Sequence, residues 1–224
     1  LAQGGIAVVM NELDSFDLHI SDTISAGRGL CKEKAVRVLV EEGKERVEEL
    51  INLGMSFDKE GSKFSLGMEG GHSARRVLHA QGSATGKAIL EFLLTHVNES
   101  ESITILENTQ CAELVKENES VIGAIAYNKL NNTFYNIKSK ATFITSGGYS
   151  RLYERSTNSN TILGDGISLA LKAGARVRDL EFIQFHPTAF FKQNGKSFLI
   201  SEAVRGEGAY LLNENFERFM FGKH

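Results

Sequence analysis

Residues 141–148 have the sequence ATFITSGG, in which apolar and β-branched residues alternate and end in Ser146, Gly147 and Gly148. The alternation predicts a β-strand. The two glycines after it leave room for the backbone to come close to a bound nucleotide. The chain contains no Gly-x-Gly-x-x-Gly motif, so it lacks a dinucleotide-binding fingerprint of its own.

Further strands are predicted on the N-terminal side of this stretch. Short β-branched segments alternate there, and polar turns such as Asn131-Asn132 separate them. The pattern is typical of an antiparallel meander, or of a sheet that carries an antiparallel flap. The five predicted strands cover residues 103–106, 111–115, 121–127, 133–137 and 141–145.

Helical spacing of apolar residues predicts the remaining elements. Gly43 weakens the second predicted helix, so two consecutive helices remain an alternative to one. Residues 55–84 show little periodicity and predict a long loop, and long ordered loops are uncommon without a function. Helices and strands together predict a mixed α/β (α+β) fold. The predicted helices cover residues 14–26, 32–53, 85–97 and 165–173.

The chain changes character near Glu181, where it becomes aromatic-rich and contains its only proline, Pro187. We place a domain boundary there, which gives domains at residues 1–181 and 182–224. The chain opens on a glycine-bearing apolar segment without Met, and residues 217–224 complete no element. We therefore expect an internal fragment that is truncated at both ends.

Composition narrows the function classes. A formal net charge of −3 provides no basic surplus for nucleic acid, and 42% hydrophobic residues argue against disorder. Cys31 and Cys111 lie far apart, which argues against a disulfide framework or a thiolate metal site. No apolar run approaches the ~20 residues that span a bilayer. We expect a soluble, cytoplasmic protein without bound metal or membrane contact.

Three stretches could carry chemistry, and each has a structural alternative. Residues 2–5 (AQGG) could bring backbone N–H groups to a ligand, or could form a turn. Asp165 could accept hydrogen bonds from a sugar-like hydroxyl chain, or could cap a helix. Residues 69–76 (EGGHSARR) place acid, imidazole, hydroxyl and guanidinium groups together, but a solvated charged loop has the same composition.

The C-terminal part adds two candidates. His186 lies between Phe185 and Pro187, a setting that suits either a ligand or a buried structural histidine. Glu202 and Arg205 are three residues apart, close enough to pair in a helical turn. Such a pair is either an ordinary surface contact or a proton relay.

Taken in order, these motifs resemble the flavoprotein family of L-aspartate oxidase, succinate dehydrogenase and fumarate reductase. The resemblance extends from Ala2 to Met220. It implies an FAD-binding domain with a Rossmann-like sheet and an antiparallel flap, followed by the start of a small α+β capping domain. Its supports are residues 2–5, 84–86, 146–148, 164–166, 184–189 and 205–208.

The resemblance also implies a cofactor wall for non-covalently bound FAD. Because the family's glycine fingerprint precedes Leu1, we expect the isolated chain to retain FAD weakly or not at all. The residues expected to contact the cofactor are Leu1, Ala2, Gln3, Gly4, Gly5, Gln110, Cys111, Ser146, Gly147, Gly148 and Asp165.

Glu69 favours the aspartate-oxidising branch, because a carboxylate can bind the ammonium group that distinguishes aspartate from succinate. His186 and Ser201 resemble the family's ligands for the substrate carboxylates, and Gln184 belongs to the same motif. Glu202 and Arg205 match its proton-relay pair, and we expect catalytic roles for them and for His186.

The implied reaction is oxidation of L-aspartate to iminoaspartate, with electrons passing through FAD to O2 or fumarate. It is the first step of de novo NAD biosynthesis. The alternatives are a succinate dehydrogenase or fumarate reductase flavoprotein, which implies an iron–sulfur partner, and a folded fragment without catalysis. Two departures bear on this: the family's catalytic arginine is absent, and Ser83 stands where the family usually has Asp.

Overall fold

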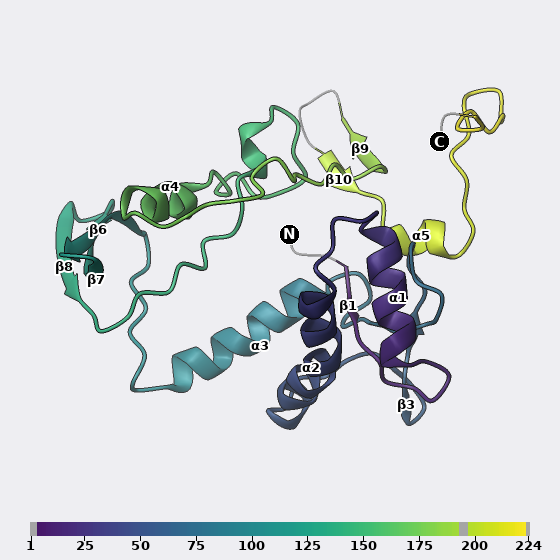
Figure 1. Cartoon of the computed structure of the whole chain (residues 1–224), viewed down its shortest axis with the longest axis horizontal. Helices are drawn as coiled ribbons and strands as arrows, with labels where there is room; N and C mark the ends of the chain where they lie inside the picture. Colours follow the sequence, from purple (N-terminus) through teal and green to yellow (C-terminus); the bar gives the residue numbers. More distant parts are fainter. Residues whose placement is uncertain (1–3, 193–196, 223–224) are drawn as a thin grey trace. The chain divides into compact units, whose positions relative to one another are not determined.

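The computed structural model describes residues 4–192 and 197–222, apart from the side chains of Glu202 and Ala203. These residues form two compact units. Unit 1 comprises residues 1–99 and 200–224, and unit 2 comprises residues 100–199. This division by compactness does not test the domain boundary near Glu181, which stays a prediction. Figure 1 shows the elements of both units in sequence colours.

Unit 1 combines helices with short antiparallel strands. The helices are α1 (Phe16–Ala26), α2 (Glu33–Asn52), α3 (Thr85–Glu99) and α5 (Glu202–Gly206). The strands are β1 (Ile6–Ala7), β2 (Lys59–Glu60), β3 (Lys63–Phe64), β4 (Leu66–Gly67) and β5 (Val77–Leu78). The first three predicted helices are confirmed, and α2 is one helix that continues through Gly43. The predicted loop 55–84 is wrong in part, because it contains β2 to β5.

The core of unit 1 lies where the central strand meets the helices. Strand β5 pairs with β1 on one side and β4 on the other, so Leu78 stands opposite both Ile6 and Leu66. Leu78 is fully buried in a cluster with Val8, Val47 and Phe57. A second cluster, of Ile20, Val36 and Val40, joins α1 to α2. Burial of these side chains fixes the helices against the loop region.

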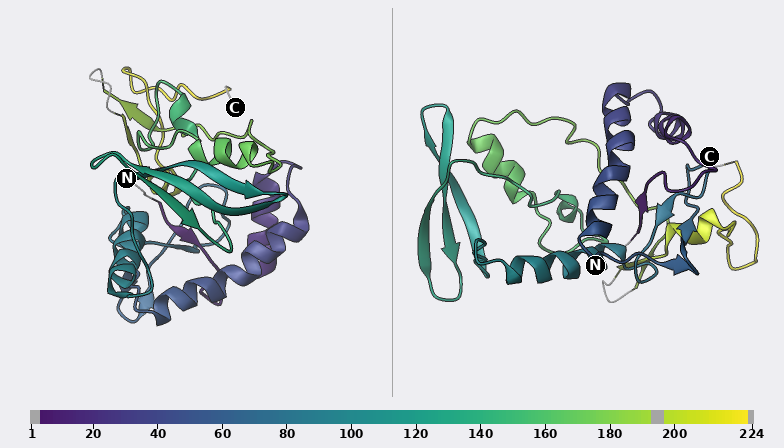
Figure 2. Two further views of the ribbon diagram at one scale, coloured as in Figure 1. Left: turned by 90° about the vertical axis from the view of Figure 1, so that its left-hand side faces the viewer. Right: turned by 90° about the horizontal axis from the view of Figure 1, so that it is seen from below.

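Unit 2 contains the predicted meander, seen as a twisted three-stranded ribbon in Figure 2. The strands pair antiparallel in the order β6-β7-β8, which confirms the flap. The elements of unit 2 are β6 (Thr109–Glu117), β7 (Ser120–Asn128), β8 (Thr133–Lys138), a 3₁₀ turn η1 (Ser150–Leu152), α4 (Asp165–Lys172), β9 (Ala189–Phe191) and β10 (Ser197–Leu199).

Two predicted strands are corrected by the structure. Residues 103–106 and 141–145 follow non-strand paths, and Phe143 is 87% exposed. A strand needs a hydrogen-bonded neighbour, and the described part of the chain pairs none with either segment. Among the helices of the described residues, none has the length and apolar character that a membrane span requires.

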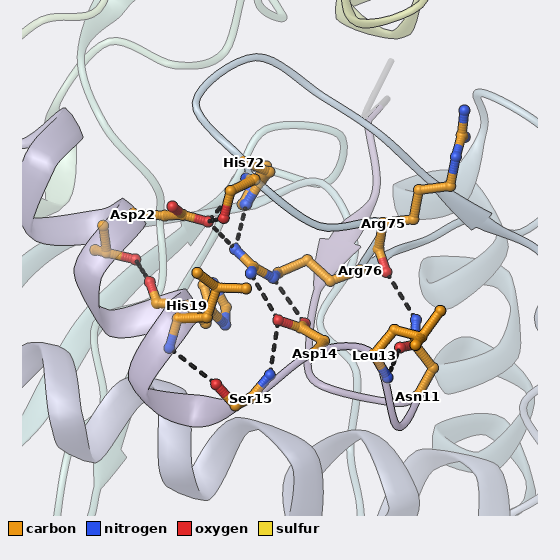
Figure 3. Close-up of polar contacts among 12 residues, drawn as sticks. Asn11, Leu13, Asp14, Ser15, His19, Asp22, His72, Arg75 and Arg76 are labelled. Carbon is orange, nitrogen blue, oxygen red and sulfur yellow. Dashed lines mark hydrogen bonds and ion pairs between the residues drawn. The ribbon is translucent and has the colours of Figure 1, made fainter.

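A buried ion pair fastens the loop of residues 69–76 to the start of α1. Arg76 and Asp14 have fully buried side chains. Arg76 donates from Nε to Asp14 Oδ2 over 2.8 Å and from its NH2 group to Oδ1 over 2.7 Å. Figure 3 shows this two-bond arrangement. It is the fork geometry in which a guanidinium binds a carboxylate most firmly.

Asp22 of α1 and His72 complete the same network (Figure 3). The NH1 group of Arg76 donates to Asp22 Oδ2 over 2.6 Å and lies 3.1 Å from His72 Nδ1. Because a guanidinium has no acceptor, His72 Nδ1 accepts in this contact. Asp22 also accepts from the backbone N–H and the hydroxyl of Ser73, over 2.9 and 2.8 Å. The loop is thus held by its side chains and by its backbone.

The network changes the pKa values of Asp14, Asp22 and the neighbouring His19. Burial alone raises the pKa of Asp14 and of Asp22, but hydrogen bonds from Arg76 and from backbone N–H groups, with the Arg76 charge, leave both pKa values lowered. Burial lowers the pKa of His19, and the charges of Arg76 and His72 lower it further. His19 Nδ1 is buried without a hydrogen-bond partner among the described residues. The neutral imidazole is therefore the form that folding favours.

Replacement of Arg76 tests the ion pair. Arg76→Met leaves two carboxylates without their cation, so we expect a loss of about 3–5 kcal/mol in the free energy of unfolding, measured by urea denaturation. The matched control is Arg75→Met, which removes an exposed ion pair and has little effect. Equal stability of the two variants contradicts the assignment.

The pH dependence of stability tests His19. Its folded pKa lies below the ordinary value of 6.5, so the unfolded chain binds the proton first as the pH falls. We expect the free energy of unfolding to decrease as the pH is lowered through about 6.5, and His19→Leu to flatten that decrease. Asp14 and Asp22 lose their contribution only below about 3.8, outside this window. An unchanged pH profile in the variant argues against the role of His19.

Candidate functional site

Glu69, the predicted specificity residue, forms a contact that the sequence did not indicate. Its Oε1 lies 3.3 Å from Nε2 of His79, and the two side chains are 19% and 18% exposed, respectively. Glu69 follows β4 and His79 follows β5. The imidazole of His79 lies over Gly67 of β4, two residues before Glu69, and from there it reaches the carboxylate. His79 stands inside an apolar stretch, and no spacing rule distinguishes it there.

Helix α5 packs directly against the backbone at Glu69. A Cβ added at Gly206 would lie 2.2 Å from the carbonyl oxygen of Met68 and 3.2 Å from Cα of Glu69. Only glycine allows this approach. The structure thereby brings the segment of Ser201 and Arg205 next to the Glu69 loop, two stretches that are more than 130 residues apart in the sequence.

A second contact joins the same two segments. Arg75 donates from NH1 and NH2 to the two carboxylate oxygens of Glu207, over 2.9 and 3.2 Å. The hydrogen bonds and the charge of Arg75 lower the pKa of Glu207. Because both side chains are more than half exposed, the pair positions the segments more than it stabilises the fold.

In unit 2, predicted cofactor residues line one pocket of about 360 Å³. Helix α4 lies against β6 there, which places Asp165 across from Gln110 and Cys111. Asp165 is the first residue of α4, and Gly164 holds the N-cap position with φ of 86°. The alternative that Asp165 caps the helix is therefore wrong. The pocket is lined by Gln110, Cys111, Ala112, Tyr127, Phe134, Asp165, Ser168, Leu169 and Lys172.

The glycine loop at Ser146 packs on the start of the same helix. A Cβ at Gly166 would lie 2.0 Å from Ser146 Oγ, and one at Gly164 would lie 2.8 Å from Cβ of Tyr149. Gly147 and Gly148 stay exposed. Ser146 therefore lies beside the first turn of α4, which Asp165 begins, and the cofactor wall stays a prediction.

The N-terminal glycine loop is described from Gly4 onward, and Leu1, Ala2 and Gln3 lie outside the described residues. Gly4 has φ of 82° and open space where a side chain would stand. It forms a parallel bridge with Ala84, just before α3. Gly5 stands opposite His79, so this loop passes beside the Glu69–His79 contact.

The remaining predicted ligands are divided between the two units, and the side chain of one of them lies outside the described residues. Gln184 is exposed, and His186 is half-buried with its Nδ1 accepting the N–H of Thr188 over 3.2 Å. Ser201 is half-buried in unit 1, and the side chain of Glu202 lies outside the described residues. A site that combines His186 with Ser201 and Glu69 stays a prediction.

The lining of the unit 2 pocket suits a cofactor that has both polar and apolar parts. Backbone and side-chain polar groups at Gln110, Asp165 and Ser168 surround a pocket with apolar walls, which is the usual make-up of a cofactor site. Among the described residues, no three His, Cys, Asp or Glu side chains gather as they would around a metal ion. Cys31 and Cys111 are free thiols.

Two proteins with similar sequences are both named L-aspartate oxidase. The chain is 44% identical to L-aspartate oxidase of Clostridium acetobutylicum over 98% of its length, and 41% identical to that of Vibrio cholerae over 98%. The chain spans 50% and 43% of those proteins, about half of their length or less.

Solved structures with other names have a similar fold. A variant of the E. coli quinol fumarate reductase chain FrdA matches with a TM-score of 0.89 at 29% identity, over 98% of this chain and 37% of that one. Mycobacterium smegmatis Sdh1 matches with a TM-score of 0.82 at 32% identity, over 100% of this chain and 40% of that one. A family described as FAD binding domain covers residues 1–224. The chain therefore belongs to the FAD binding domain family, whose cofactor is FAD.

Proposed function

We propose that this chain is the FAD-binding and substrate-recognising part of an L-aspartate oxidase. The observation that carries the proposal is the placement of Glu69. Its carboxylate is mostly buried, its loop is fastened by Arg76, and its backbone contacts α5 at Gly206. The names of the relatives support the same assignment.

The proposed role of Glu69 is to bind the ammonium group of aspartate. A charge-assisted hydrogen bond of this kind contributes about 1.5–3 kcal/mol. Succinate has the same two carboxylates but no ammonium group, so it gives the mostly buried acid no cation to bind. The same residue therefore selects aspartate and disfavours its unaminated analogue.

Oxidation of aspartate to iminoaspartate removes a hydride from Cα and a proton from nitrogen. FAD, when bound, supplies the hydride acceptor. The chain's own part is to hold the substrate and to move the proton. His186 and Ser201 are the proposed ligands for the substrate carboxylates, with Gln184 beside them. Glu202 and Arg205 are the proposed proton relay.

The remaining parts of the proposal concern the whole enzyme. Its electrons pass to O2 or fumarate, and its product enters NAD biosynthesis. We use the term complete enzyme for a protein that contains this chain and has the full length of its relatives. We propose a cytoplasmic location for it, without a nucleic-acid or membrane partner.

The second candidate is a fumarate reductase or succinate dehydrogenase flavoprotein. The TM-score of 0.89 to quinol fumarate reductase favours it. A shared backbone leaves the substrate open, however, because specificity depends on individual side chains in the site. Glu69 is the side chain that separates the two candidates.

Glu69→Gln in the complete enzyme tests the proposal. We expect kcat/KM for L-aspartate to fall about 10- to 150-fold, the equivalent of losing a charge-assisted bond of about 1.5–3 kcal/mol. The inhibition constant of succinate stays the same or decreases. The matched control is Glu60→Gln, an exposed acid of β2. An unchanged preference for aspartate over succinate overturns the proposed recognition.

Gly206→Ala tests the contact between α5 and the Glu69 loop. The new Cβ collides with the carbonyl of Met68 and pushes the two segments apart. We expect kcat/KM for aspartate to fall about tenfold while flavin absorbance is retained, since a displacement of about 1 Å is costly for catalysis. The control is Gly43→Ala, where the added methyl group meets open space on α2. Equal activity of both variants contradicts the close packing.

A further inference from the structure

We propose that His79 is a positioning residue, which holds the Glu69 carboxylate in the orientation that binds the substrate's ammonium group. This inference rests on the proposed function of Glu69. It names a second residue for substrate recognition, one that acts through Glu69.

The contact has a defined direction. An ionised carboxylate only accepts hydrogen bonds, so Nε2 of His79 is the donor to Oε1 of Glu69, over 3.3 Å. A neutral imidazole with its proton on Nε2 satisfies one carboxylate oxygen and leaves the negative charge in place. Oε2 remains for the ammonium group. In that form the histidine fixes the acid and leaves its negative charge for the substrate.

The backbone around His79 is built to hold the ring in one place. His79 follows β5, the central strand of its sheet, and its carbonyl accepts the N–H of Asp58 over 2.8 Å. The ring is 18% exposed. A residue anchored on a central strand is a more rigid support than one on a surface loop.

Two glycines make room for the imidazole. A Cβ at Gly67 would lie 2.7 Å from Cε1 of His79, and one at Gly5 would lie 3.0 Å from its Nε2. Any other residue at either position would press on the ring. The space for His79 is therefore a feature of β4 and of the N-terminal glycine loop together.

The position of Gly5 relates the contact between His79 and Glu69 to the predicted cofactor loop. Residues 4 and 5 belong to the loop predicted to pass along the flavin. Nε2 of His79 faces this loop on one side and Glu69 on the other. An acid fixed from that direction holds an ammonium group beside the cofactor loop, where the adjacent Cα has to lie for oxidation.

The test compares two replacements of His79 in the complete enzyme. Phe fills the ring's space without a donor, and Gln retains a donor on a side chain of similar length. We expect His79→Phe to raise KM for aspartate about tenfold with kcat changed less than threefold, and to leave the inhibition constant of succinate within twofold. His79→Gln restores KM to within about threefold of the parent. A uniform loss for both ligands, or no rescue by Gln, overturns the inference.

A double variant separates this inference from the proposed function. If His79 acts through Glu69, His79→Phe has no further effect on aspartate once Glu69→Gln is present. Additive losses overturn the role of His79 and leave that of Glu69 intact. If Glu69→Gln alone leaves the aspartate preference unchanged, the proposed function fails instead.

Gly67→Ala provides a route that keeps the histidine, should His79→Phe fail to fold. The added methyl group displaces the imidazole, while the backbone of Gly67 has a conformation that alanine adopts. We expect the same rise in KM for aspartate and the same indifference to succinate. Unchanged discrimination in a folded, flavin-containing Gly67→Ala enzyme overturns the proposal.

Discussion

The arrangement of unit 1 depends on one buried cation. Arg76 is fully enclosed, and it is acceptable there only because Asp14 and Asp22 compensate its charge and receive its hydrogen bonds. Both acids lie at α1 or just before it, so the pairing defines where the loop of residues 69–76 runs. A loop that would otherwise be mobile is held at one end by an ion pair and at the other by β4. The position of Glu69 between these two points follows from both.

The local sequence pattern was enough to predict those helices and strands whose hydrogen bonds join residues close together in the sequence. Helices α1, α2 and α3 and the meander β6-β7-β8 were predictable, because their spacing and turns are local. Residues 103–106 and 141–145 have the same alternation but lack a paired neighbour among the described residues. Strands β2 to β5 contain only two residues each, too few for any periodicity. Pairing between distant segments decides both cases, and a local pattern does not contain it.

The candidate site was predictable in its motifs and not in its contacts. Gln110, Cys111 and Asp165 line one pocket and Ser146 lies beside Gly166, but contact of these residues with a cofactor stays a prediction. The glycines, however, serve packing as much as ligand approach: Gly206 admits α5, Gly166 admits the Ser146 loop, and Gly67 admits His79. A glycine in a sequence indicates that another group can come close to the backbone there, but it does not show which group this is. His79 was missed for the same reason, since its importance lies in a neighbour ten residues away.

The fold of this chain and its substrate specificity depend on different features of the sequence. Fumarate reductase chains have nearly the same fold as this chain at 29% identity, so the fold alone does not separate a dicarboxylate from an amino acid. The difference between the two substrates is one positive charge. One mostly buried carboxylate is enough to distinguish the two substrates. Its charge attracts the ammonium group, and the same charge is energetically unfavourable when it is removed from water without a cation. Such an acid discriminates only if it cannot turn away toward solvent or toward a nearby cation. The fastened loop, the packing at Gly206 and the histidine at its side restrict that freedom, and specificity therefore depends on the support of Glu69 as much as on its charge.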